Sequence, residues 1–139
     1  VEICCKLKAG VVHQDEKENG LRAILNLGHT YGHALEKCSE YKIFTHGEAV
    51  ALGLQVCFDL SFALNLIDEK YYDKASELIN LFEFNLPEHP YYTPEMIMSA
   101  MKFDKKVQNG KIRFVLPVNV GEVAIFDNID RDILHKIIS

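Results

Sequence analysis

The chain has 139 residues, of which 48% are hydrophobic, and its formal net charge at pH 7 is −5. A chain of this length and apolar content is expected to form one domain that buries roughly two-thirds of its unfolded surface, which excludes a disordered protein. The acidic balance, with a pI near 5.6, argues against nucleic acid or an anionic membrane surface as the main partner.

Apolar residues at helical spacing predict three helices in the first half of the chain. The first covers residues 1–18, and the second covers residues 21–38. Gly28 and Gly32 lie four positions apart inside the second, where a smooth face suits either a crowded ligand site or close helix packing. A third helix over residues 47–65 is apolar nearly all round, which is typical of a helix at the centre of a bundle.

The second half of the chain carries clear start signals for further helices and one hairpin. Asp68 is a good N-cap for a fourth helix that ends near residue 82. Thr93-Pro94 opens a fifth helix to about residue 103. Strands are expected over 111–116 and 123–126, followed by a last helix capped by Asn128 or Asp130. The expected fold class is therefore mostly α, a multi-helical bundle with a small peripheral β-hairpin.

The cysteines and the N-terminal residues indicate the cellular compartment of the protein and whether the chain is part of a longer one. The four cysteines Cys4, Cys5, Cys38 and Cys57 form no Cys-x-x-Cys pair, and we expect reduced core thiols in a cytoplasmic protein. No apolar run reaches the roughly 18 residues of a membrane span, and no signal peptide pattern is present. Because the chain begins at Val1 inside a helical pattern, we expect it to be a fragment of a longer protein.

Three of the six histidines, His29, His33 and His46, fall within 18 positions. A helix places His29 and His33 on one face, a spacing that presents two metal ligands or a ligand and a proton-transfer group. His46 precedes the third helix, where a turn could return it to the pair. A catalytic zinc takes three protein ligands, and Glu36 and Glu48 are further oxygen candidates. Spacing alone does not decide which of the five would bind.

Polar residues lead into the histidines at helical steps. The stripe consists of Glu18, Arg22, Asn26, His29 and His33. It is either one wall of a ligand site or a solvated helix face. Arg22 can hold a carboxylate or phosphate with two hydrogen bonds, and Asn26 can bind a hydroxyl. Three lysines outside the stripe could neutralise a phosphate: Lys8, Lys105 and Lys106.

Several of these motifs, in this order, resemble those of 3-dehydroquinate synthases. They are Lys8-Ala-Gly-Val-Val12, the run Asp15 to Ala34 with its Leu-Asn-Leu-Gly-His-Thr-Tyr-Gly-His-Ala ending, His46-Gly-Glu-Ala-Val-Ala-Leu-Gly53, Asp104-Lys-Lys106 and Gly110 to Leu116. The resemblance covers about residues 5–117. It implies an enzyme with an N-terminal NAD-binding domain and a C-terminal helical domain that binds metal and substrate. Residues 1–139 correspond to the second domain, and the NAD-binding domain is absent from this chain.

The resemblance also implies an activity and residue roles. The family is a group of cytoplasmic lyases that use NAD and a divalent metal, zinc or another such as cobalt. They convert 3-deoxy-D-arabino-heptulosonate 7-phosphate into 3-dehydroquinate and phosphate in the shikimate pathway to aromatic amino acids, and are expected to be homodimers. Carried over by position, the metal ligands are His29 and His46, with a third, a glutamate, upstream of this chain. The acid–base residues are His33 and Glu18. The substrate contacts are Lys8, Arg22, Asn26 and one of Lys105 and Lys106, with the choice between the two lysines open.

Three other functions stay open beside this one. Another NAD-dependent sugar-phosphate cyclase, such as a 2-deoxy-scyllo-inosose synthase, shares the metal motif, although Arg22 favours an acidic substrate. A metal-binding helical module without catalysis is a second alternative. A metal-dependent alcohol dehydrogenase is disfavoured by the long match around His29.

Overall fold

The structure, a computed structural model, describes residues 1–14, 21–82, 92–102 and 112–139, with the backbone alone for residues 21–23. Its elements are α1 (Glu2–Gln14), the 3-10 helix η1 (Leu21–Asn26), α2 (His29–Cys38), α3 (His46–Ala63), α4 (Glu69–Asn80), α5 (Pro94–Lys102), β1 (Phe114–Asn119), β2 (Glu122–Phe126) and α6 (Arg131–Ile138). This confirms the predicted mostly α class with one hairpin. None of the described helices combines the length and apolar character that a membrane span requires.

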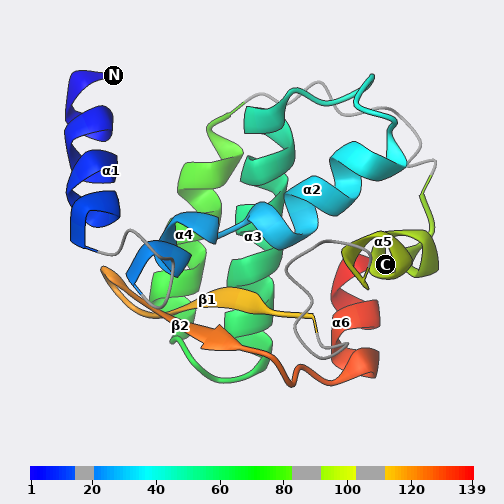
Figure 1. Ribbon diagram of the computed structural model, residues 1–139. Coiled ribbons are helices and arrows are strands. Elements are labelled where there is room, and N and C mark those ends of the chain that lie inside the picture. The colour runs from blue at the N-terminus through cyan, green and yellow to red at the C-terminus, as the bar shows by residue number, and fades with distance from the viewer. Residues whose placement is uncertain (15–20, 83–91, 103–111) are drawn as a thin grey trace.

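Helix α3 lies at the centre of the described bundle, as its sequence predicts. It packs against α2, α4, α6 and β1 (Figure 1). Val56, Cys57 and Leu60 of α3 are buried in the main hydrophobic core. Burial raises the pKa of the Cys57 thiol to about 12, so this cysteine is a protonated core residue at neutral pH.

The predicted helix starts are confirmed in three places. The side chains of Asp68, Thr93 and Asp130 each accept a hydrogen bond from a backbone N–H two or three residues further on. Such caps satisfy backbone donors that the first helical turn leaves unpaired, and each stabilises its helix by about 1 kcal/mol. Local sequence therefore determines where α4, α5 and α6 begin.

The hairpin at the edge of the helices also completes the core. Strands β1 and β2 are antiparallel, with Phe114 opposite Phe126. Phe114 and Leu116 are fully buried, and β1 packs against α3. The hydroxyl of Thr30 donates to the carbonyl of Arg113 at 2.9 Å, which ties the first turn of α2 to the start of β1.

The prediction of one continuous helix over residues 21–38 is wrong. A break separates η1 from α2 at Gly28, whose φ of 78° lies in the left-handed region. Gly28 and Gly32 pack against α3 so closely that a Cβ at Gly53 would lie 1.9 Å from the Gly28 carbonyl oxygen. Of the two functions considered for these glycines, the structure supports close helix packing. The expected polar stripe is consequently not one helix face.

Helix α1 stands apart from α2 and α3 and contacts η1 (Figure 1). None of its 13 residues is buried, and Leu7 is 68% exposed. The expectation of core thiols is therefore wrong for Cys4 and Cys5, which are exposed, whereas Cys57 is buried. Apolar spacing predicted a helix over residues 1–18, which is confirmed for Glu2–Gln14, while residues 15–18 lie outside the described residues. Spacing does not show what covers a helix face.

Candidate metal centre

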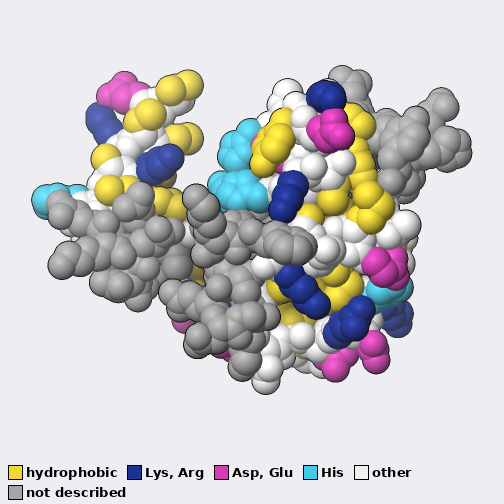
Figure 2. Space-filling model, turned by 45° about the vertical axis from the view of Figure 1, so that its right-hand side comes forward, with side chains coloured by type: hydrophobic (Ala, Val, Ile, Leu, Met, Phe, Trp, Pro, Cys, Tyr) yellow, Lys and Arg dark blue, Asp and Glu magenta, His cyan; other side chains and the backbone are white. Residues whose placement is uncertain are grey.

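The three neighbouring histidines converge at one place on the surface. His29 is the first residue of α2, His33 lies one turn later, and His46 is the first residue of α3. The ring centroids are 5.4 Å apart for His29–His33, 5.4 Å for His29–His46 and 5.9 Å for His33–His46. Figure 2 shows histidine side chains gathered on the face of the main body that looks toward α1. The expectation that His46 returns to the pair is confirmed.

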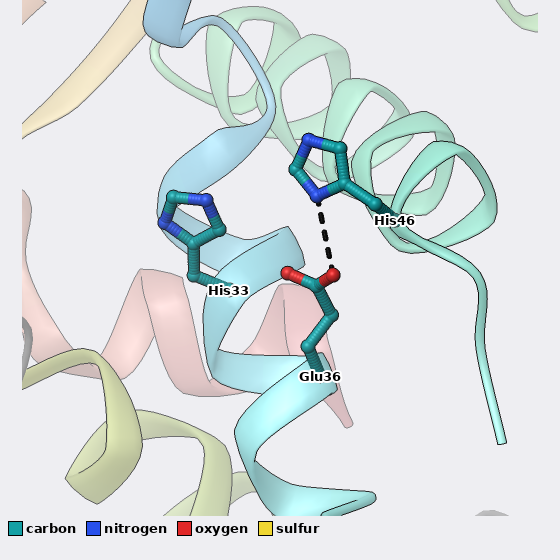
Figure 3. Close-up of side chains that lie close together, drawn as sticks. All are labelled: His33, Glu36 and His46. Atoms are coloured by element: carbon teal, nitrogen blue, oxygen red, sulfur yellow. Dashed lines mark hydrogen bonds and ion pairs between the residues drawn. The ribbon is translucent and has the colours of Figure 1, made fainter. Parts of the chain in front are cut away.

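Glu36 brings a carboxylate to the same cluster, one turn after His33 on α2. Its Oε1 lies 3.1 Å from Nδ1 of His46 (Figure 3). Ligand atoms of His33, Glu36 and His46 all lie within 4.8 Å of one another. Imidazole nitrogens and a carboxylate oxygen suit zinc and similar divalent ions, so this donor set fits a divalent metal.

Hydrogen bonds decide which nitrogen of two rings carries a proton. Nδ1 of His29 lies 3.1 Å from the carbonyl oxygen of Leu27. Because a carbonyl oxygen can only accept, Nδ1 must be the donor, and in the neutral ring Nε2 then holds the lone pair. The contact between Nδ1 of His46 and the carboxylate of Glu36 has the same consequence. Both rings therefore have Nε2 as their potential metal-binding atom.

The three rings differ in their mutual orientation. The interplanar angle is 25° between His33 and His46 and 61° between His29 and His46. Ligand atoms of His33 and His46 lie within 4.8 Å of each other and of a Glu36 oxygen, so the geometry permits more than one pair of these histidines to hold one ion.

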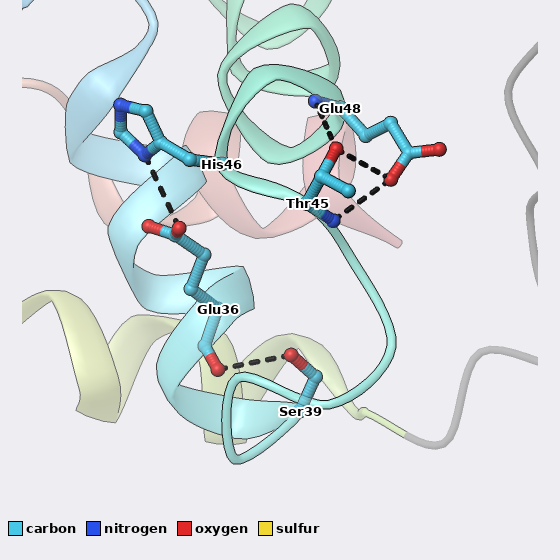
Figure 4. A network of polar contacts seen from close by, with 5 residues as sticks. All are labelled: Glu36, Ser39, Thr45, His46 and Glu48. Carbon is cyan, nitrogen blue, oxygen red and sulfur yellow. Dashed lines mark hydrogen bonds and ion pairs between the residues drawn. The ribbon is translucent and has the colours of Figure 1, made fainter.

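The other oxygen candidate, Glu48, is engaged at the start of α3. Its carboxylate accepts hydrogen bonds from the backbone N–H and the hydroxyl of Thr45, at 2.8 and 2.7 Å (Figure 4). These hydrogen bonds lower the pKa of Glu48. The Thr-x-x-Glu spacing is that of a capping box and could have identified this role from the sequence. The sequence offered no comparable signal for the contact of Glu36 with a residue of the next helix.

The other predicted site residues lie on other elements or outside the described residues. Lys8 is exposed on α1, which stands apart, and Asn26 is half-buried at the end of η1. Arg22 belongs to η1, but its side chain lies outside what the structure describes. Glu18, Lys105 and Lys106 lie outside the described residues.

Comparison with known proteins assigns the chain to a family. Residues 1–107 match the family model described as 3-dehydroquinate synthase C-terminal. The chain is 41% identical to the 3-dehydroquinate synthase of Shewanella frigidimarina over 136 residues, which cover 98% of this chain and 38% of that relative. It is 42% identical to the 3-dehydroquinate synthase of a Picosynechococcus strain, covering 100% of this chain and 38% of that protein. The chain thus spans about two-fifths of the length of these relatives.

Solved structures share the fold. A 2-deoxy-scyllo-inosose synthase complexed with carbaglucose-6-phosphate, NAD+ and Co2+ superposes with a TM-score of 0.81 at 24% identity, covering 99% of this chain and 39% of that one. A 2-epi-5-epi-valiolone synthase from Streptomyces hygroscopicus, with NAD+ and Zn2+ bound, gives a TM-score of 0.72 at 20% identity, covering 92% of this chain and 35% of that one. Taken with the family model and the relatives at about 40% identity, the chain belongs to the 3-dehydroquinate synthase C-terminal domain family.

Proposed function

We propose that this chain is the metal- and substrate-binding domain of a 3-dehydroquinate synthase, whose NAD-binding domain lies in the remainder of the protein. The complete enzyme would convert 3-deoxy-D-arabino-heptulosonate 7-phosphate into 3-dehydroquinate and phosphate. The observation that carries the proposal is the convergence of three imidazoles, 5.4 to 5.9 Å apart, in a chain of this family. The proposal includes a cytoplasmic location and a homodimeric assembly, as expected from the resemblance.

His29 and His46 are the proposed metal ligands, each through Nε2. The hydrogen bonds at Nδ1, which leave Nε2 of both rings as the potential metal-binding atom, support this choice. A bound divalent ion supplies Lewis acidity for the oxidation of a substrate hydroxyl, with NAD as the hydride acceptor. The third ligand, a glutamate, is expected outside this chain, so the domain by itself would bind zinc more weakly than the complete enzyme.

His33 is the proposed proton-transfer residue. Its ring lies 5.4 Å from that of His29, so its nitrogens can reach a substrate hydroxyl that sits beside the metal. Glu18 is the second proposed acid–base residue. Lys8, Arg22, Asn26 and one of Lys105 and Lys106 are proposed to hold the carboxylate and phosphate of the substrate, which positions it for reaction.

The test separates the three histidines in the complete protein. His29→Ala and His46→Ala are expected to lose bound zinc as well as phosphate release. His33→Ala should retain zinc, and its turnover should fall by about 10²- to 10⁴-fold, the usual contribution of a general acid or base. The two measurements are zinc binding, followed by calorimetry, and phosphate release. Tight zinc binding that is lost only with His33→Ala would overturn the ligand assignment.

Two controls address the whole-protein activity. The 139-residue chain alone should release no phosphate from substrate, NAD and zinc, because it lacks the proposed nucleotide domain. A sugar phosphate without a carboxylate should be a poor substrate for the complete enzyme. If it were the better substrate, the activity would be that of another sugar-phosphate cyclase.

A further inference from the structure

We propose that Glu36 is a positioning residue for His46: its carboxylate holds the imidazole in the Nδ1–H form and so presents Nε2 to a divalent metal. This inference rests on the proposed function, in which His46 is a metal ligand. It gives Glu36 a role different from the direct ligation that its carboxylate would also permit.

The backbones of both partners are fixed independently of their contact. The carbonyl oxygen of Glu36 accepts hydrogen bonds from the Ser39 hydroxyl at 2.9 Å and the Tyr41 N–H at 2.8 Å, which close the last turn of α2. His46 follows Thr45, whose capping box with Glu48 fixes the first turn of α3. Figure 4 shows the Ser39–Glu36 contact and the Thr45–Glu48 contacts on either side of the Glu36–His46 hydrogen bond. The side-chain contact therefore has to orient the imidazole alone, on a backbone that is already in place.

Burial of the carboxylate makes the contact more than a surface ion pair. The side chain of Glu36 is 10% exposed, whereas that of His46 is 59% exposed. A carboxylate that loses most of its hydration requires hydrogen-bond donors, and Nδ1 of His46 is one at 3.1 Å. The buried partner is thus the fixed one, and the exposed imidazole is held against it.

The other proposed ligand shows the same arrangement with a different acceptor. Nδ1 of His29 lies 3.1 Å from the Leu27 carbonyl oxygen, the same separation as in the Glu36–His46 pair. Histidines that bind metals through one nitrogen commonly donate the other N–H to a carbonyl or carboxylate, which fixes the tautomer and the ring. Both candidate ligands on α2 and α3 therefore expose the same nitrogen.

Direct ligation by Glu36 is the competing arrangement, and it makes a different demand on His46. If His46 bound the metal through Nδ1, beside a ligating Glu36, that nitrogen would lose its proton on metal binding and its hydrogen bond to Glu36 would be lost. The tautomer of His46 in the metal-free protein tests whether Nε2 is presented, and the response of metal affinity to an amide at position 36 distinguishes the two arrangements.

The first experiment reads the tautomer directly. Nitrogen chemical shifts of His46 are measured in the metal-free complete protein, in mildly alkaline buffer, for wild type, Glu36→Gln and Glu36→Leu. We expect the Nδ1–H form in the wild type, its retention in Glu36→Gln because an amide oxygen can accept the same proton, and a mixture of forms in Glu36→Leu. An Nε2–H form in the wild type would overturn the inference.

The second experiment measures Co2+ affinity from its visible absorption in the same proteins. Glu36→Gln should weaken binding by about 10-fold and Glu36→Leu by about 100-fold, the usual range for the loss of such a supporting contact. The matched control is Glu48→Gln, which keeps its capping function and should bind Co2+ as the wild type does. His46→Ala provides the reference for loss of a ligand.

The outcomes separate this inference from the function on which it rests. If Glu36→Gln loses as much affinity as His46→Ala, Glu36 is a direct ligand and the inference is wrong. Affinity in Glu36→Leu equal to that of the wild type also overturns it. If instead His46→Ala binds Co2+ as tightly as the wild type, the proposed metal role of His46 fails. If Glu36→Leu does not fold, the Co2+ affinities of Glu36→Gln and His46→Ala still decide whether Glu36 positions His46 or binds the metal directly.

Discussion

The crossing of α2 and α3 at Gly53 makes a sharp prediction, because an added methyl group would meet backbone. A Cβ at this position would lie 1.9 Å from the carbonyl oxygen of Gly28 and 2.8 Å from its carbonyl carbon. The shorter contact falls about 1.5 Å below the 3.4 Å at which ordinary van der Waals contact begins. Neither backbone can rotate away as a side chain would, so Gly53→Ala must push the two helices apart.

We expect Gly53→Ala to lower the free energy of unfolding by up to about 2 kcal/mol. Overpacking of a dense interior costs up to about 3 kcal/mol, and the better helix propensity of alanine offsets about 1 kcal/mol of this. The measurement is urea unfolding followed by the helical circular dichroism signal. Gly47→Ala is the control in the same helix, since a Cβ there meets nothing within 4 Å, and its stability should be unchanged or slightly raised.

The same substitution tests whether the helix crossing sets the spacing of the proposed ligands. A shift of α2 against α3 moves His29 relative to His46, and metal sites tolerate only about 0.2 Å in ligand distance. Co2+ affinity in the complete protein should therefore fall in Gly53→Ala and persist in Gly47→Ala. Equal stability of the two variants would refute the packing argument, and wild-type affinity in a destabilised Gly53→Ala would refute the link to the metal site.

Two further predictions concern ionisation and thiol exposure. A hydrogen bond from His135 on α6, with others from the Glu95 backbone and Thr93, lowers the pKa of Glu95 from 4.5 to about 2. The ionised Glu95 carboxylate therefore stabilises the folded protein above pH 4.5, and this contribution is lost as the pH falls towards 2. Glu95→Gln should therefore melt at a lower temperature than the wild type at neutral pH, with the difference vanishing near pH 2; a difference that persists there would contradict this. A thiol reagent should modify the exposed Cys4 and Cys5 quickly in the native chain and the buried Cys57 only on unfolding. Fast native labelling of Cys57 would contradict its position in the core.

Local signals predicted much of the fold. Asp68 and Asp130 cap the helices that follow them, and Thr93-Pro94 begins α5. These starts could be predicted because a cap is a contact between residues only two or three positions apart, which the local sequence determines. The nearly continuous apolar sequence of residues 47–65 likewise predicted α3 as the central helix. The prediction failed at Gly28, because a glycine that a helix can tolerate also readily adopts the left-handed conformation found there.

For the candidate site, the sequence by itself determined that His29 and His33 share a face, because a helical turn alone sets that relation. Only the tertiary structure decided the rest. The contact of Gly28 with α3 begins α2 at His29, and the approach of α3 brings His46 beside it. The contact of Glu36 with the histidine cluster was also decided by the tertiary structure, since Glu36 meets a residue ten positions away on another helix. Helical spacing determines which side chains share a face, but the packing of two helices determines which faces meet.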